Sequence, residues 1–483
     1  MTCDKPCKQE SYRGFGRDRS VVLMLLIIAI LAISSLLWGE RLQVNGGLGW
    51  DGQKYGIISQ DLNVRALDTY YFQRILPSTV VHFALIALRE PLDNQHVVLA
   101  FIFLNLGLLL LSCLLYRSIA EELDLGLSGF WFGFIGIFVN FAYFKFAWYY
   151  PVLTDVTATS LSLAMLLFYL RRKQVLLVVV ILLGAFTWPS MVYLGFVLLM
   201  FQREPIVEQG SRLPKWLAAG TTMFVTLGVV VLYFVMHHAS SPVEPIYTML
   251  PFSLVLCLLY IYYGSVVLMH GVSVKTLLTS FTARSAVIAA TLFVAIMIPG
   301  FLWADHTKHA VSMAGTIAAT LTRSVVMPLG FVVAHCVYFG PVFLLLMFYW
   351  KPFTIIVRNY GLGITLVIWM GVLLSINSES RQNLPCYIMA VPFLGLLVQK
   401  LALPARFLWI LGALALVYSK VWMRMNLPAY DDNWQHQRFP SQNLFMNIGP
   451  WMNKSMYLLQ GVIVLVTAVL LYTYLNNTKR KLV

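Results

Sequence analysis

Charged side chains are scarce in this chain. Only 11% of its 483 residues are Asp, Glu, Lys or Arg, whereas 59% are hydrophobic. Soluble domains carry about 25% charged residues, so a water-soluble fold could not cover this much apolar surface. The apolar runs last about 18–25 residues and mostly lack the alternation that barrel strands show. The sequence therefore predicts an all-α, polytopic transmembrane helical bundle.

Cysteine pairs and common cofactor motifs are also missing. The six cysteines are scattered without a C-x-x-C pair, so no disulfide framework is predicted. There is no Walker loop, G-x-G-x-x-G or H-E-x-x-H motif, so nothing supports ATP-driven chemistry. His306 and His309 share the spacing of one helical face, but Asp305 is the only further ligand type nearby. We predict no metal site there.

The net charge of +14 has a topological explanation. Lys and Arg concentrate at the cytoplasmic ends of membrane helices, so this charge does not indicate a nucleic-acid partner. The tails, residues 1–20 and 476–483, are both basic and are predicted to be cytoplasmic, which requires an even number of crossings. Residues 21–475 then form one transmembrane domain of about 12 spans. The predicted spans are Val21–Gly39, Val97–Tyr116, Phe130–Trp148, Thr157–Leu170, Trp216–His237, Phe252–His270, Ala286–Trp303, Val325–Trp350, Gly361–Ile376, Tyr387–Leu401, Phe407–Trp422 and Tyr457–Tyr474.

One apolar segment does not fit a simple span. Val175–Phe201 has basic residues at both ends, and Trp188-Pro189-Ser190 interrupts its middle. Two half-helices of about 12 residues would each rise about 18 Å. We predict a cytoplasmic-side hairpin that enters the membrane and returns without crossing.

Two long segments are predicted on the outer side. The first is the loop of residues 40–96, and the second is residues 424–456. Inside the first loop, Ile75–Leu88 is apolar but too short to span, so it is expected to be an interfacial helix.

Asp51 is the first candidate for chemistry. It opens the polar stretch that follows the first span and stands close to Gln53 and Tyr55. A carboxylate at the outer membrane face could accept a proton from a hydroxyl that attacks a sugar carbon. The alternatives are a solvated loop carboxylate or an Asx-turn with Gly52.

Arg74 and Asp155 lie on the same predicted face. Arg74 precedes the interfacial helix and could hold a phosphate, or it could snorkel among lipid headgroups. Asp155 opens a helix, where an acid has a structural role, but it also shares the outer face with Asp51. Lys145 lies inside the preceding span and needs a partner, for which Asp155 is a candidate.

A third polar cluster runs from Ser378 to Pro385 between two apolar spans. Its Arg381 departs from the tendency of basic residues to lie inside. An outer-face arginine at a helix entrance is a candidate clamp for an anionic headgroup or diphosphate. The alternative is a surface ion pair between Glu379 and Arg381.

These features together resemble a known family. The residues concerned are Asp51-Gly52-Gln53-Lys54-Tyr55, Phe72-Gln73-Arg74-Ile75-Leu76-Pro77, Thr154-Asp155, the half-helix pair around Trp188-Pro189, and Glu379-Ser380-Arg381-Gln382-Asn383-Leu384-Pro385 running into Val391-Pro392-Phe393. Their order and sidedness are similar to those of the integral-membrane glycosyltransferases of the GT-C superfamily, most of all the polyprenyl-phosphate-sugar-dependent mannosyltransferases. Two positions depart from that pattern. Gly52 stands where the family often has a second acid, and Trp188 replaces an Arg or Lys that is common in the half-helix turn.

The resemblance implies an inverting glycosyltransferase with an outward-facing site. Asp51 would be the general base, while substrate and donor would bind at Arg381, Asp155, Arg74, Tyr55, Gln53 and Glu379. The donor would be a sugar on a polyprenyl phosphate, and the acceptor a glycan, lipid or protein. Whether a divalent cation takes part is left open. The C-terminal Lys-Arg-Lys-Leu-Val is not a plain retention signal for the endoplasmic reticulum, so a bacterial inner membrane is the expected location.

Two other classes of function remain open on the sequence. A transporter or flippase for a lipid-linked or anionic solute would also use outer arginines and intramembrane breaks such as Pro299-Gly300. It would need polar residues deep in several spans, which are sparse here. A non-catalytic partner in cell-envelope assembly is the third interpretation.

Overall fold

In the computed structural model, every regular secondary-structure element of the described residues is a helix. An isolated bridge between Phe201 and Phe281 is the one β-type pairing found there. The described residues are 7–201, 203–206, 213–239, 249–305, 321, 324–426, 442, 446, 449, 452 and 454–482.

The helices have the following bounds. In chain order they are α1 Cys7–Trp38, η1 Val44–Gly47, α2 Gly52–Gln60, η2 Val64–Ala66, α3 Thr69–Phe72, α4 Ile75–Leu88, α5 Asn94–Glu122, α6 Leu127–Phe138, η3 Ala142–Phe146, α7 Ala147–Tyr149, α8 Asp155–Leu170, α9 Gln174–Ala185, α10 Ser190–Met200, α11 Leu213–Ala239, α12 Leu250–Leu268, α13 Val274–Ser280, α14 Ala283–Trp303, α16 Gly330–Phe339, α17 Val342–Phe348, α18 Trp350–Arg358, α19 Leu362–Leu374, η5 Ser380–Asn383, α20 Leu384–Lys400, α21 Ala405–Ser419 and α23 Lys454–Leu482.

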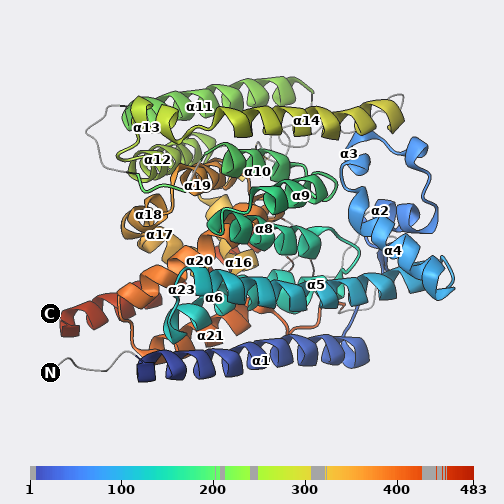
Figure 1. Ribbon diagram of the computed structural model, residues 1–483, viewed down its shortest axis with the longest axis horizontal. Coiled ribbons are helices and arrows are strands. Elements are labelled where there is room, and N and C mark those ends of the chain that lie inside the picture. The colour runs from blue at the N-terminus through green and yellow to red at the C-terminus, as the bar shows by residue number, and fades with distance from the viewer. Residues whose placement is uncertain are drawn as a thin grey trace.

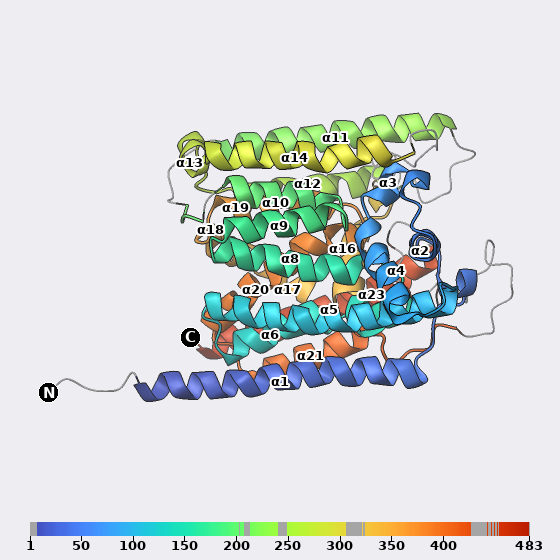
Figure 2. The same ribbon diagram turned by 45° about the vertical axis from the view of Figure 1, so that its right-hand side comes forward.

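The long helices run side by side along one axis of the molecule. Figures 1 and 2 show α1, α5 and α14 lying nearly parallel, with α2, α3 and α4 gathered at one end. We call this the first-loop end. The start of α1 and the end of α23 both lie at the opposite end (Figure 1), which we call the terminal end. This agrees with an even number of crossings.

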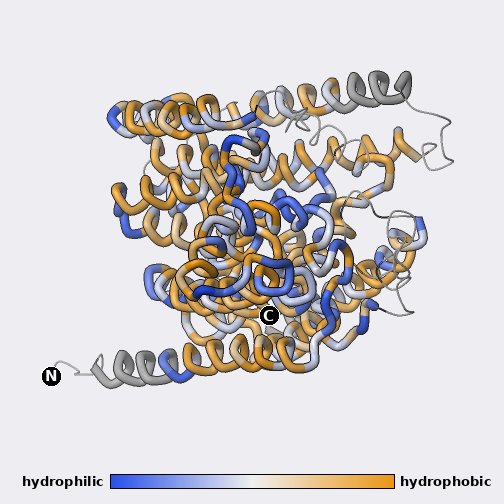
Figure 3. The backbone as a smooth tube through the Cα atoms, turned by 90° about the vertical axis from the view of Figure 1, so that its right-hand side faces the viewer, coloured by the Kyte–Doolittle hydropathy of each residue, from blue (hydrophilic) through white to orange (hydrophobic). Residues whose placement is uncertain are grey.

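Membrane character is clear from the helices, although the predicted number of spans is not confirmed. Six described helices are long and apolar enough to cross a membrane, and a seventh span results if α6 and the segment Ala142–Tyr149 count as one. The six are Asp18–Trp38, Asn94–Glu122, Leu250–Leu268, Ala283–Trp303, Ser380–Lys400 and Lys454–Asn477. Ten of the twelve predicted stretches coincide with one helix each, although several of these helices have only 10–17 residues. The other two are divided: Phe130–Trp148 contains α6, η3 and α7, and Val325–Trp350 contains α16 and α17. In Figure 3 the helical tubes are mostly hydrophobic, and the polar residues concentrate in the connections.

Local breaks explain why several helices are short. The predicted span Phe130–Trp148 bends by 56° after α6. Buried Asn140 occupies the bend and donates to the carbonyls of Gly136 and Ile137, so its amide replaces part of the helical hydrogen bonding. Gly340, with a φ of +80°, separates α16 from α17. By contrast, α14 continues through Pro299, so the break expected there is wrong. A proline removes one hydrogen bond, and here the helix tolerates that loss.

The predicted hairpin is present as two short helices. α9 and α10 pack against each other, and Gly195 faces Ile181 so closely that a β-carbon would overlap the isoleucine side chain. The turn between them reaches the first loop. The Leu76 amide donates to the Phe186 carbonyl over 2.8 Å, and the Phe72 and Phe186 rings meet edge to face. The hairpin thus connects the body of the bundle to the first-loop end.

The helix predicted within the first loop has the expected bounds, because α4 spans Ile75–Leu88. One face buries Val81 and Leu85 against the protein, while Phe83 and Leu88 are exposed. An exposed apolar face suits contact with lipid, so an interfacial position stays a prediction.

Candidate functional site

Asp51 is held in place by its two neighbours. The Trp50 ring packs edge to face on Tyr150, and the Gly52 amide donates to the Tyr150 hydroxyl over 2.8 Å. A β-carbon on Gly52 would lie 2.6 Å from the carbonyl oxygen of Val152. Gly52 is therefore required by close backbone packing, and a second acid could not occupy its position without moving the first loop.

Arg381 connects two carboxylates that are far apart in the sequence. Its Nε and Nη2 donate to Oδ1 and Oδ2 of Asp155 over 2.8 and 2.9 Å, which is a bidentate pair. Its Nη1 donates to Oδ2 of Asp51 over 3.2 Å. The three side chains that sequence patterns singled out separately therefore form one cluster.

The cluster combines buried and accessible parts. The Asp155 side chain is 7% exposed and that of Arg381 is 16% exposed, whereas the Asp51 side chain is 53% exposed. Asp155 accordingly holds the guanidinium from the protein side, and Asp51 is open to solvent or substrate. As the N-cap residue of α2, Asp51 forms no side-chain capping bond, so the Asx-turn alternative is wrong.

Helix α16 forms hydrogen bonds both to Asp155 and to η5, the short helix that carries Arg381. The Tyr338 hydroxyl donates to Oδ1 of Asp155 over 3.3 Å. His335 Nε2 lies 2.7 Å from the Ser375 carbonyl, so it must be the donor, and Nδ1 accepts from the Ser380 hydroxyl over 3.0 Å. These bonds fix the start of η5, the short helix that carries Arg381.

Two alternative pairings from the sequence are wrong. Lys145 pairs with Glu40 over 2.8 Å and also donates to the Met423 carbonyl, so it does not reach Asp155. Lys145 lies next to the loop after α1, and the Glu40 carboxylate also accepts backbone amides from the chain after α21. Arg381 pairs with Asp155 and Asp51 instead of with Glu379.

Arg74 is a second guanidinium in this region. It is buried, its Cζ lies 3.8 Å from the centroid of the Tyr70 ring, and its Nη1 donates to the Tyr70 carbonyl over 3.3 Å. Its Cζ is 5.3 Å from the Trp188 ring, and the Cζ of Arg381 is 5.6 Å from that same ring. No carboxylate pairs with Arg74 within the part of the chain that the structure describes. It is thus a stacked cation with donors available for an anion.

Glu379 is an acidic group that this environment affects strongly. Burial raises its pKa to about 7, because the loss of water outweighs the nearby positive charge of Arg381, and the charges of Asp51 and Asp155 act in the same direction as burial. Close to neutral pH this carboxyl is therefore partly protonated.

Two further predicted residues have different positions. Tyr55 is buried and packs edge to face on Tyr71, and burial raises its pKa. Its side chain packs within the first loop. Gln53 is exposed on α2, and neither residue contacts Arg381 through a hydrogen bond.

No group of three His, Cys, Asp or Glu side chains with metal-binding geometry occurs among the described residues. His306 and His309 lie outside those residues, as does most of the predicted outer segment 424–456. Within the cluster, Arg381 stands between the two carboxylates, so a cation shared by them would have to displace a guanidinium that forms three hydrogen bonds.

Comparison of the chain with models of known protein families, with curated protein sequences and with solved structures finds no match. The protein is therefore described by its own fold and site: a multi-pass helical membrane protein with an Arg–carboxylate cluster at its first-loop end.

Sequence reasoning missed several residues of this site. Trp188 was predicted to mark the hairpin turn but not to belong to the site, yet its ring lies close to both guanidinium groups. Tyr70, Tyr338 and His335 were not singled out, because aromatic residues are abundant in membrane helices. The one available signal was a polar His335 inside an apolar run, since such residues are costly there unless they have a partner.

Proposed function

We propose that this protein is an inverting glycosyltransferase that moves a sugar from a polyprenyl-phosphate donor to an acceptor at the first-loop end. The observation that carries the proposal is the direct contact of Arg381 with both Asp51 and Asp155. Side chains must lie within hydrogen-bond reach of one reacting centre to act on the same bond. The proposal assigns the first-loop end to the periplasmic or lumenal face and the terminal end to the cytoplasm.

The reaction assigns one role to each charge. The acceptor oxygen forms a bond to the anomeric carbon as the bond from that carbon to the phosphate oxygen breaks. The hydroxyl proton passes to Asp51, and the electron pair of the broken bond leaves with the polyprenyl phosphate. The phosphate then carries one more negative charge, which Arg381 and Arg74 are placed to neutralise.

The resting ion pair suggests how the base becomes available. Asp155 holds Arg381 with two hydrogen bonds in a buried position, whereas Asp51 holds it with one longer bond at an accessible position. A donor phosphate would take the place of Asp51 at Nη1 without disturbing the bidentate pair. Asp51 would then be free to accept the proton.

The test is turnover of synthetic polyprenyl-phosphate hexoses by purified protein in nanodiscs. We expect wild-type protein to release polyprenyl phosphate and the Asp51→Asn variant to lose at least 100-fold in rate, as removal of a general base does. Asp61→Asn is the matched control, because Asp61 is an exposed acid at the other end of α2. Equal rates for wild type and Asp51→Asn would refute the assigned role. Passage of the intact lipid across the bilayer without cleavage would indicate a flippase instead.

A further inference from the structure

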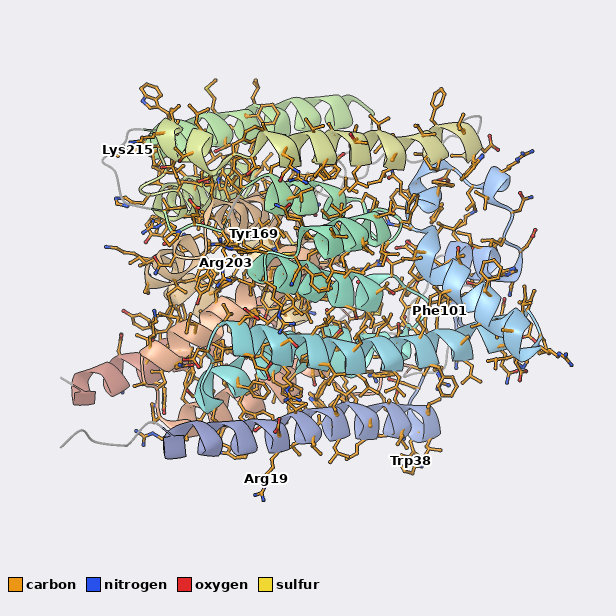
Figure 4. The ribbon with its side chains drawn as sticks, in the orientation of Figure 1. Arg19, Trp38, Phe101, Tyr169, Arg203 and Lys215 are labelled. Carbon is orange, nitrogen blue, oxygen red and sulfur yellow. The ribbon has the colours of Figure 1, made fainter. Side chains whose placement is uncertain are left out.

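A polar cavity lies at the terminal end of the bundle. It has a volume of about 250 Å³ and is formed where the α8–α9 turn meets the end of α10. Its polar lining is Arg172, Gln174, Tyr169 and Arg203, and Leu177 and Leu198 belong to its apolar part. Figure 4 shows Tyr169 and Arg203 close together in this region, far from the first-loop helices.

Three neighbouring arginines at this end have different partners. Arg171 is neutralised by Glu122, whose carboxylate lies 2.8 Å from its Nε. Arg172 donates from Nη2 to the Arg203 carbonyl over 2.9 Å, and Arg203 donates from Nη1 to the Leu170 carbonyl. The two arginines that line the cavity thus bind backbone carbonyls, and no carboxylate pairs with either in the described ranges.

The two guanidinium groups are held in position by their surroundings. The Cζ of Arg203 lies 5.3 Å from the Tyr360 ring, and Tyr360 in turn accepts a hydrogen bond from Tyr169 through its carbonyl. Arg172 has a φ of +54°, a left-handed conformation that is uncommon for arginine. The local backbone keeps it there with a 3.1 Å hydrogen bond from its amide to the Tyr169 carbonyl. The backbone thus directs Arg172, an exposed residue, toward the cavity, where its guanidinium is held by the bond to the Arg203 carbonyl, and the Arg203 guanidinium lies against Tyr360.

The surface beside the cavity is suited to lipid. Val175 is 77% exposed and Leu176 is also exposed, and both directly follow Gln174 of the lining. Apolar side chains exposed at the end of a membrane helix face the hydrocarbon region. A ligand could therefore reach the cavity from the bilayer with its anionic group against the arginines.

We propose that this cavity binds a phosphate ester, with Arg172 and Arg203 as the anion-binding residues. The shared chemistry is a phosphate monoester or diester with a short apolar stem, which comes either from an anionic phospholipid or from a soluble metabolite. The site lies at the opposite end from the Arg381 cluster, so it does not depend on the proposed transferase activity.

The test uses the full-length protein in nanodiscs of phosphatidylcholine mixed with phosphatidylglycerol, with retained lipid counted by native mass spectrometry. We expect wild-type protein to retain phosphatidylglycerol and the Arg172→Gln/Arg203→Gln double variant to lose about tenfold in retention, because two charge-assisted contacts are removed. Arg171→Gln is the matched control and should retain the lipid as wild type does. Circular dichroism checks that the double glutamine variant is folded. The Arg172→Lys/Arg203→Lys variant keeps both charges and should retain more phosphatidylglycerol than the double glutamine variant.

A second arm identifies the source of the phosphate. Calorimetry with glycerol 3-phosphate measures binding from water by the same protein. Binding of this compound that the double glutamine variant abolishes, without lipid retention, supports the site with a soluble ligand. Absence of both kinds of binding, or equal retention by wild type and a folded double glutamine variant, overturns the proposal.

Discussion

Arg381 at the first-loop end and the cavity arginines at the terminal end are held in opposite ways. At the first-loop end Arg381 is bound by two carboxylates, one buried and one accessible. At the terminal end Arg172 and Arg203 are fixed by backbone carbonyls. An arginine that carboxylates hold is oriented but must exchange a partner before it binds an anion, whereas an arginine held by carbonyls keeps its full charge for a ligand. The first arrangement suits a reaction cycle, and the second suits steady occupancy.

The largest expected effect comes from separating the members of the buried pair. Arg381→Gln leaves the Asp155 carboxylate, 7% exposed, without its bidentate partner. We expect a loss of about 3–5 kcal/mol in the free energy of unfolding, since an unpaired buried charge is costly. Thermal unfolding in detergent measures it.

The control for this variant is Arg117→Gln. Arg117 forms exposed ion pairs with Asp18 and Glu121 on the surface of α5. Exposed pairs contribute about 0–1 kcal/mol, so this variant should unfold close to wild type. If Arg381→Gln were no less stable than Arg117→Gln, the buried pair would not have the importance assigned to it.

The next effect concerns the backbone that positions Asp51. Gly52→Ala places a β-carbon 2.6 Å from the Val152 carbonyl, so the first loop must shift. We expect a loss of about 1–3 kcal/mol in stability, as for other overpacked sites. Gly107→Ala on α5 is the matched control, because a β-carbon there meets nothing within 4 Å and alanine favours the helix. Equal stability of the two variants would contradict the close packing at Gly52.

The last effect, which appears only as the pH changes, is a pH dependence from Glu379. Its pKa in the folded protein is about 7, above the ordinary value of 4.5, so the stability from the protonated carboxyl is lost as pH rises through this range. Glu379→Gln stays neutral at every pH. Its unfolding temperature should equal that of wild type near pH 4 and exceed it by about 3 °C near pH 8. A difference that is constant with pH would exclude a raised pKa in the folded state.

Much of the architecture could be predicted from the sequence. Ten of the twelve predicted spans coincide with one helix each, α4 has the expected bounds, and the hairpin around Trp188 is present as two short helices. These features depend on local signals, namely apolar runs and their interruption by proline or polar residues. The start of α1 at Cys7 was missed, because the basic segment before Val21 lacks the apolar pattern of a span. The twelve predicted crossings are not confirmed, because several of the helices concerned have only 10–17 residues.

The sequence predicted the three charged residues of the candidate site, but it did not predict how they pair. Asp51, Asp155 and Arg381 were each notable as polar residues beside apolar runs, and common sidedness brought them together. Which acid holds the arginine depends on how α8 and η5 pack, and no sequence spacing encodes a contact between residues 155 and 381. The position of Trp188 could not be predicted for the same reason, because its ring lies close to Arg74 and Arg381, which are far apart in the sequence.

The central claim is that a phosphate displaces Asp51 from Arg381 and thereby frees the base. The most direct measurement is the affinity of wild-type and Asp51→Asn protein in nanodiscs for polyprenyl phosphate without a sugar. Removing the competing carboxylate should tighten binding by about two- to fivefold, the size expected for an accessible ion pair, even though the variant cannot transfer sugar. Weaker binding by Asp51→Asn, or no binding by either protein, would contradict the account.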